Sequence, residues 1–320
     1  MNIVVLAGGV GGSTFAAGLL DALGPGDSGV VTIVVNVGDD IWLNGLRVCP
    51  DLDTVMYRLA GVGDDERGWG RPGDSGRVAA ELSAYGLGTS WFTVGDLDIA
   101  THLARTRLLT EGWTLSEATA ALCSRWDIPA AIIPATDEPD ETLVRLRDGR
   151  TVHFQEWWVR MRASEPAAAF GRELGSPPAA APGVLAAVRD ADVVVFAPSN
   201  PVVSIGRILE VRGVRDAIAT TGAVVVGVSP IIGDAPVRGM ADQCLSAIGV
   251  DCSAAGVARH YGARSDSGLL DGWLLDTVDR DAVAVLAASG ITAEVAPLLM
   301  TDADAARELA RRTLVLALSL

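Results

Sequence analysis

The chain has 320 residues, of which 49% are hydrophobic, and its 40 acidic and 25 basic residues give a formal net charge of −15. This charge disfavours nucleic acids and anionic membrane surfaces as partners, because both would repel it. The chain contains no lysine. A Walker A motif, a pyridoxal Schiff base and a lysine general base are therefore excluded.

The four cysteines lie far apart and form no CxxC pair: Cys49, Cys123, Cys244 and Cys252. This spacing predicts buried thiols rather than a zinc site or a disulfide framework. The first residues do not resemble a signal peptide, because no basic residue precedes the apolar run and a glycine turn follows it directly. No apolar run approaches the roughly 18 residues of a membrane span. We therefore expect a cytoplasmic protein.

Four short runs rich in valine predict buried strands, at residues 2–7, 30–37, 192–197 and 223–228. Helical periodicity flanks each run. This alternation predicts an α/β fold with a Rossmann-like, mostly parallel sheet and helices on both faces. We interpret residues 1–320 as a single α/β domain.

Between about residues 51 and 130 the pattern changes to successive amphipathic segments. The last of these begins with Thr114 and Glu117 at the spacing of a capping box. We interpret this span as a helical insertion that covers the carboxyl end of the sheet. A short β-rich piece should follow at about 130–154, and residues 303–316 should close the chain as a helix.

A glycine turn follows the first predicted strand and consists of Gly8, Gly9, Gly11 and Gly12. Glycines let the backbone approach a phosphate, and a helix N-terminus offers unpaired N–H groups to it. The dinucleotide fingerprint is incomplete, because Thr14 occupies the third glycine position and Asn36 that of the usual ribose-binding acid. The turn therefore predicts phosphate binding rather than a nicotinamide cofactor. A tight turn without a ligand is the alternative.

Four aspartates follow the second predicted strand within one short stretch: Asp39, Asp40, Asp51 and Asp53. Ligands bind outside the carboxyl ends of parallel strands, and carboxylates there are suited to a hard cation. The alternative is helix capping and solvation, which fits Asp51 well because it follows Pro50 at a predicted helix start. We favour a cation site that assists phosphoryl chemistry.

Two polar loops follow the third and fourth predicted strands. The first contains Ser199 and Asn200, and the second contains Ser229 and Arg238. Such loops are where nucleotides bind in open α/β sheets, and an arginine there is suited to a phosphate. Each pattern alone is weak evidence.

The three histidines suggest no Ser–His–Asp triad, and the chain has no GxSxG elbow. His102 lies on a predicted helix and His260 near a predicted helix end. His153 opens the segment HFQEWWVR, whose aromatic residues fit either a binding surface or a core-packing turn.

Several motifs in order carry a family resemblance: AGGVGG, VVNVGDDIWLNGLRVCPDLDT, RGWG, GDLDIATHLART, HFQEWWVR, APSNPVVSIG, SPIIG with RGMAD, and RHYGAR. From residue 1 to about 305 the chain resembles the 2-phospho-L-lactate transferase family of coenzyme F(420) biosynthesis, most closely its actinobacterial phosphoenolpyruvate transferases. The resemblance implies a Rossmann-like homodimer. It also implies the transfer, with Mg²⁺, of a phosphoenolpyruvyl or 2-phospho-L-lactyl group from its guanosine diphosphate-activated donor to the deazaflavin Fo, releasing GMP.

The resemblance also implies roles for particular residues. Asp39, with Asp40, would bind the metal and act in catalysis, while Asn36, Asp51 and Asp53 would contact Fo. The guanosine nucleotide would be held by the glycine turn and the two loops, through Gly8, Gly9, Gly11, Gly12, Ser199, Asn200, Ser229 and Arg238. The all-arginine, alanine-rich composition is typical of a GC-rich, actinobacterium-like genome. Because the resemblance is closest to actinobacterial phosphoenolpyruvate transferases, this favours the phosphoenolpyruvyl donor.

The chain departs from the family pattern at three places. A basic residue usual after the glycine turn is replaced by Ser13-Thr14-Phe15, and GDRD is replaced by Gly95-Asp96-Leu97-Asp98. The region after RGWG also lacks the family's common aromatic or histidine residues. The loss of two positive charges would weaken binding of anionic ligands, shift the substrate, or be compensated by Arg77, Arg105 or Arg107. A diverged paralogue is the alternative.

Two other functions compete with this interpretation. A non-catalytic regulator that binds a nucleotide sugar would share the glycine turn but would have no use for the PDLDT and HFQEWWV segments. A Rossmann oxidoreductase is disfavoured by the incomplete fingerprint.

Overall fold

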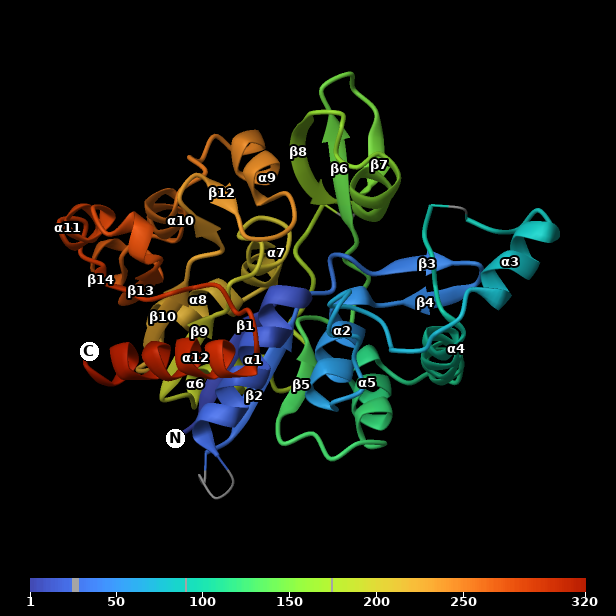
Figure 1. Cartoon of the computed structure of the whole chain (residues 1–320), viewed down its shortest axis with the longest axis horizontal. Coiled ribbons are helices and arrows are strands. Elements are labelled where there is room, and N and C mark those ends of the chain that lie inside the picture. The colour runs from blue at the N-terminus through green and yellow to red at the C-terminus, as the bar shows by residue number, and fades with distance from the viewer. Residues whose placement is uncertain (25–28, 90, 174) are drawn as a thin grey trace.

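The computed structural model describes residues 1–24, 29–89, 91–173 and 175–320. Its central sheet has seven strands in the order β14-β13-β10-β9-β1-β2-β5, and every pairing is parallel (Figure 1). The strands are β1 (Ile3–Ala7), β2 (Val31–Val35), β5 (Ala131–Pro134), β9 (Val193–Phe196), β10 (Val224–Val228), β13 (Gly272–Leu275) and β14 (Thr292–Val295). The strand order reverses between β1 and β9, as in Rossmann-like folds. The predicted fold class is confirmed.

Helices cover both faces of this sheet (Figure 1). One face carries α1 (Val10–Leu23), α2 (Pro50–Leu59), α5 (Leu115–Cys123) and α12 (Ala303–Leu318). The other carries α6 (Val184–Arg189), α7 (Ile205–Glu210), α8 (Val214–Thr220), α10 (Ala254–Tyr261) and α11 (Ala282–Ala287). Successive strand residues point to opposite faces, so Val4 and Leu6 of β1 join one core while Ile3 and Val5 join the other. Burial on both faces explains the unbroken apolar runs.

Smaller elements surround the carboxyl end of the sheet. They are the hairpin β3 (Ile41–Leu43) and β4 (Leu46–Val48), the antiparallel sheet of β6 (Thr142–Leu146), β7 (Thr151–His153) and β8 (Ala167–Arg172), and the hairpin β11 (Ile231–Ile232) and β12 (Ala235–Pro236). The π-helix η1 (Glu156–Arg160) follows β7, and α9 (Ala241–Ala247) packs near β8. The described part of the chain also contains two short 3₁₀ helices, η2 (Arg264–Asp266) and η3 (Thr277–Asp279).

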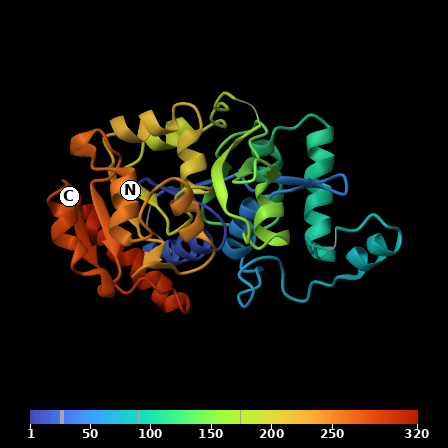
Figure 2. The same cartoon turned by 90° about the horizontal axis from the view of Figure 1, so that it is seen from above.

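The predicted helical span divides into two parts. α2 and α5 pack on the sheet beside β5, whereas α4 (Asp96–Thr110) packs against β4 and α5. α3 (Arg77–Ala84) has no buried residue and lies at the end of the molecule opposite α11, as Figures 1 and 2 show. Within the described ranges, no helix is both long and apolar enough to cross a membrane.

The sequence interpretation missed or misassigned three strands. Residues 130–135 were grouped with the β-rich piece, but β5 belongs to the main sheet, where it pairs with β2. β13 and β14 were not predicted, because GWLL and TAEV are four-residue segments without a long β-branched run. The closing helix was predicted at 303–316 and is observed at Ala303–Leu318, with Asp302 as its N-cap.

Gly18 lets α1 and α12 cross at close range. A Cβ atom at this position would collide with the backbone of Ala306, which cannot move without displacing α12. We expect Gly18→Ala to lower the free energy of unfolding by about 1–3 kcal/mol, as overpacked cores do. Urea denaturation measures this change. Gly222→Ala is the matched control, since a Cβ there meets no atom within 4 Å. Equal stability of the two variants would contradict the packing argument.

Candidate functional site

A cavity of about 1100 Å³ lies at the carboxyl ends of four neighbouring strands. Gly9 after β1, Asp39 after β2, Ser199 after β9 and Ser229 after β10 all line it. This is the position where the strand order reverses and where open α/β sheets bind ligands. Nine of the predicted site residues line the cavity: Gly9, Gly11, Asp39, Asp51, Asp53, Ser199, Asn200, Ser229 and Arg238. Gly8, Gly12, Asn36 and Asp40 lie behind its wall.

The glycine turn permits close approach of three chain segments. A Cβ atom at Gly11 would collide with the carbonyl oxygen of Pro198, and one at Gly9 would lie 2.6 Å from Asp51 Oδ1. The Gly8 N–H donates to Ser199 Oγ at 3.0 Å, which ties β1 to the loop after β9. α1 begins here without a side-chain cap, and Gly9, Val10 and Gly11 line the cavity, where N–H groups of a helix start are suited to an anion.

Asn36 joins two carboxylates at the edge of the cavity. Its Nδ2 donates to Asp39 Oδ1 and to Asp51 Oδ2, each at 2.9 Å. Burial and the neighbouring Asp51 raise the pKa of Asp39 well above its usual range, and burial raises the pKa of Asp51 to about 6. Two neighbouring carboxylates with raised pKa values that share one amide donor form a site that a cation would stabilise. Asp51 thus does more than start a helix, since it makes no capping hydrogen bond there.

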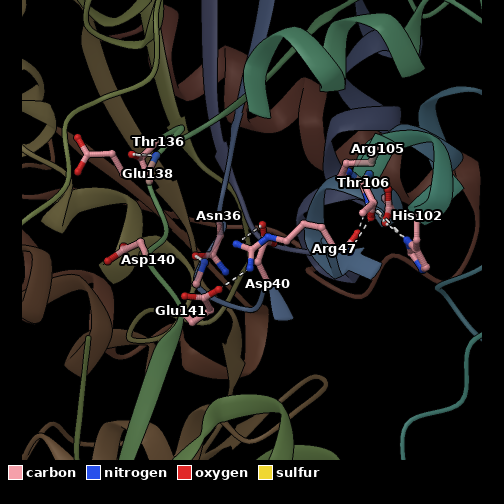
Figure 3. Close-up of polar contacts among 12 residues, drawn as sticks. Asn36, Asp40, Arg47, His102, Arg105, Thr106, Thr136, Glu138, Asp140 and Glu141 are labelled. Atoms are coloured by element: carbon pink, nitrogen blue, oxygen red, sulfur yellow. Dashed lines mark hydrogen bonds and ion pairs between the residues drawn. The ribbon is translucent and has the colours of Figure 1, made fainter. Parts of the chain in front are cut away.

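Asp40 has a different environment from Asp39. It is 0% exposed, does not line the cavity, and lies 3.3 Å from Arg47 of β4, which also pairs with Glu141 (Figure 3). Burial raises the pKa of Asp40 to about 7 in spite of Arg47. The fold therefore brings Asp51, and not Asp40, to the cavity beside Asp39. The predicted pairing of Asp39 with Asp40 on a metal stays a prediction.

Asp53 is held by α4. Arg105 forms a bidentate ion pair with its carboxylate, and His102 Nδ1 lies 3.4 Å from Asp53 Oδ2. Although burial opposes ionisation, Arg105 and His102 lower the pKa of Asp53 to about 2. Figure 3 shows Arg105 and His102 side by side on α4. The charged carboxylate of Asp53 is thus a fixed part of the cavity wall.

The predicted nucleotide residues mainly shape their loops. Ser229 Oγ accepts from the Ile231 N–H and donates to the Ile231 carbonyl, and Asn200 Oδ1 accepts from Val202 N–H. Arg238 donates to the carbonyl of Arg67, so it connects the RGWG loop with the loop after β10. These contacts hold both loops at the cavity rim.

Apart from Arg238, the arginines that line the cavity are ones that the sequence analysis did not choose. Arg77 and Arg107 are surface side chains, and Arg105 is committed to Asp53, so none of the three lines the cavity. The arginines that line it, among the residues with described positions, are Arg58, Arg162 and Arg238. Arg162 has a left-handed backbone, with φ of 52°, a conformation that is concentrated at functional sites. No local sequence signal marks it.

Gln155 was also missed. It follows β7, lines the cavity, and donates from Nε2 to Asp39 Oδ2 at 3.2 Å, across 116 positions of the chain. Its neighbour His153 lies 3.1 Å from the Asp40 carbonyl through Nε2 and accepts from the Gln155 N–H through Nδ1. The core-packing interpretation of the aromatic segment is confirmed for Trp157, which packs against Phe154 and Phe170, and the binding interpretation stays a prediction, although Trp157 also lines the cavity.

Comparisons with known proteins agree on one family. The family model described as 2-phospho-L-lactate transferase CofD matches residues 3–315. A protein of Streptomyces coelicolor named phosphoenolpyruvate transferase is 55% identical to this chain, over 99% of this chain and 98% of the relative. A protein of Nocardia farcinica with the same name is 50% identical, over 99% of this chain and 95% of the relative. One from a Mycobacterium species is 48% identical over 97% of each.

A solved structure supports the fold independently. A UPF0052-family protein of Bacillus halodurans superposes with a TM-score of 0.62 at 18% identity, covering 98% of this chain and 99% of that one. At that identity the likeness concerns the fold alone. The family model matches nearly the whole chain, and the named relatives are 48–55% identical to it. The protein therefore belongs to the 2-phospho-L-lactate transferase CofD family.

Proposed function

We propose that this protein transfers a phosphoenolpyruvyl group, or alternatively a 2-phospho-L-lactyl group, from its guanosine diphosphate-activated donor to the deazaflavin Fo, with release of GMP. The observation that carries the proposal is the Asp39–Asn36–Asp51 cluster beside the open N-terminus of α1 in one large cavity. The names of relatives that are 48–55% identical favour the phosphoenolpyruvyl donor.

The donor atoms at this cluster fit Mg²⁺. Within the described part of the chain, no three His, Cys, Asp or Glu side chains come together as a complete metal site. Mg²⁺ does not require one, because it is commonly held by one or two carboxylates, waters and substrate phosphates. Asp39 and Asp51 would supply the carboxylates, with Gln155 and Asn36 fixing the rotamer of Asp39. When bound, the ion would neutralise charge on the transferred phosphoryl group.

Phosphoryl transfer of this kind depends on positioning and charge neutralisation rather than on a covalent nucleophile. The N–H groups at the start of α1 suit the diphosphate, and Arg58, Arg162 and Arg238 supply positive charge around the cavity. A lysine-free chain can perform this chemistry with these groups.

We also propose that the protein is a homodimer, as the family resemblance implies. Its candidate contact surface is the end of the molecule formed by α3. No residue of α3 is buried, and the apolar side chains of Tyr85 and Leu87, which follow it, are exposed. Sedimentation equilibrium measures the mass. A single species at 33.1 kDa would contradict the proposal.

Incubation with Fo, Mg²⁺ and the enolpyruvyl or lactyl donor tests the proposed activity. We expect stoichiometric GMP and a more acidic deazaflavin product, and we expect EDTA to abolish both. No product with either donor at high protein concentration would refute the enzymatic function. Thermal stabilisation by a uridine diphosphate sugar, without stabilisation by GDP, would instead support a nucleotide-sugar-binding regulator.

A further inference from the structure

A second polar cluster lines the same cavity and has no assigned task. His102 and Asp98 lie four residues apart on one side of α4, and Asp53 faces them from α2. Residues at this helical spacing are neighbours on the helix surface. All three side chains are buried and also line the cavity. A ligand bound in the cavity would therefore contact them in a site that is shielded from bulk solvent.

The imidazole of His102 is oriented by Asp53. Nδ1 of His102 lies 3.4 Å from Asp53 Oδ2. Arg105 Nη1 also lies 3.4 Å from this Nδ1, but it donates a hydrogen bond to Asp53 Oδ2 at 3.0 Å. A carboxylate at Nδ1 selects the tautomer that carries its proton on Nδ1 and leaves Nε2 as the acceptor. Among the residues whose positions are described, Nε2 of His102 has no hydrogen-bond partner.

Asp98 offers a free acceptor beside this ring. It is 8% exposed, and its Oδ1 is buried without a hydrogen-bond partner in the described parts of the chain. Burial, more than its neighbours, raises the pKa of Asp98 to about 6. A buried acceptor without a partner is costly unless a ligand supplies a donor. Other ionisable groups that act on this cluster are Tyr57 on α2, Arg105 on α4, Cys123 on α5 and Asp74, which lies near Asp98.

We propose that His102 is the general base of the transfer reaction and removes the proton from the attacking hydroxyl of the acceptor. This inference rests on the proposed function. The O–H bond breaks and its proton moves to His102 Nε2, while the oxygen forms a bond to the phosphorus that bears the three-carbon acid. The bond from that phosphorus to the bridging oxygen of GMP breaks, and its electron pair leaves with GMP. Asp53 stabilises the imidazolium, and Asp98 accepts a hydrogen bond from a neighbouring hydroxyl of the acceptor.

His102→Gln tests this role, with His260→Gln as the matched control because His260 is exposed on α10, outside the cavity. We expect kcat of His102→Gln to fall by about 100-fold or more, the usual contribution of a general base, with the KM for Fo changed by less than about threefold. Protonation of the base contributes to the acidic limb of the kcat–pH profile, so this limb should change in His102→Gln. His260→Gln should keep the wild-type rate and profile.

A purely structural role predicts a different result. If His102→Gln retains kcat within about threefold of wild type and keeps the acidic limb, the proposal is overturned. If that variant unfolds, His102→Asn, whose amide can retain the contact with Asp53, is measured instead by the same criteria. Added imidazole should restore part of the rate to His102→Ala, and no restoration would count against the base. An inactive wild-type protein would refute the proposed function itself, whereas active wild type with active variants would refute only the role of His102.

Discussion

Asp39→Asn is expected to lower kcat by about a thousandfold, or roughly 4 kcal/mol of transition-state stabilisation, and to raise the Mg²⁺ concentration needed for half-maximal rate. The amide keeps the shape of the side chain but removes one of the two charges that border the cavity beside Asn36. Asp51→Asn should have an effect of the same kind, since the two carboxylates share one donor. Steady-state rates over a Mg²⁺ titration measure both quantities.

Asp40→Asn separates the two possible carboxylate pairs. Asp40 is buried against Arg47 outside the cavity, so its replacement should lower the free energy of unfolding and leave the half-saturating Mg²⁺ concentration unchanged. If Asp40→Asn shifts the Mg²⁺ dependence and Asp51→Asn does not, the pairing predicted from the sequence is right and the pairing favoured by the structure is wrong. Unchanged Mg²⁺-dependent turnover in Asp39→Asn would refute a metal role for Asp39.

Arg105→Met should be the most destabilising single change in the site, by about 3–5 kcal/mol, because it leaves the buried carboxylate of Asp53 without its partner. Arg105 is 1% exposed and forms a bidentate pair with Asp53. Arg107→Met is the matched control, since Arg107 lies two positions away and pairs with Glu111 at the surface. It should change stability by less than about 0.5 kcal/mol. Urea denaturation at neutral pH compares the two.

The pH dependence of stability provides an independent check on this ion pair. The folded-state pKa of Asp53, about 2, lies below its ordinary value of 3.8, so its contribution is present above pH 4 and is lost as the pH falls towards 2. Arg105→Met should lose less stability than wild type over that interval, since the partner that lowers the pKa is gone. Equal acid sensitivity of the two proteins would show that Arg105 does not stabilise the charged form.

The strands of the sheet and the glycine turn could be predicted because their signals are local. Runs such as Val31–Val35 are β-branched and buried on both faces, and the glycines from Gly8 to Gly12 mark the start of helix α1, which begins at Val10. The four-residue strands β13 and β14 gave too short a pattern for prediction, and their place in the sheet depends on pairing, of β13 with β10 and of β14 with β13.

The partners of the aspartates could not be predicted in this way. Asp40 is adjacent to Asp39 in sequence, but the turn directs it to Arg47 in the β3–β4 hairpin. Asp51 is twelve positions from Asp39 and meets it through Asn36, and Gln155 reaches Asp39 from a different sheet. Proximity along the chain therefore does not show which carboxylate lines the cavity beside Asp39, because a side chain's direction depends on the backbone turn that presents it.

By itself, the sequence determined the α/β class, the edge of the sheet at which the cavity lies and the residue types present there, since periodicity, glycine placement and the absence of lysine do not depend on tertiary contacts. Only the tertiary structure decided which carboxylates and which arginines line the cavity, and that His102 lies beside Asp53. The physical reason is that burial and ion pairing set the charge and direction of each side chain, and both arise from segments that are distant in the chain.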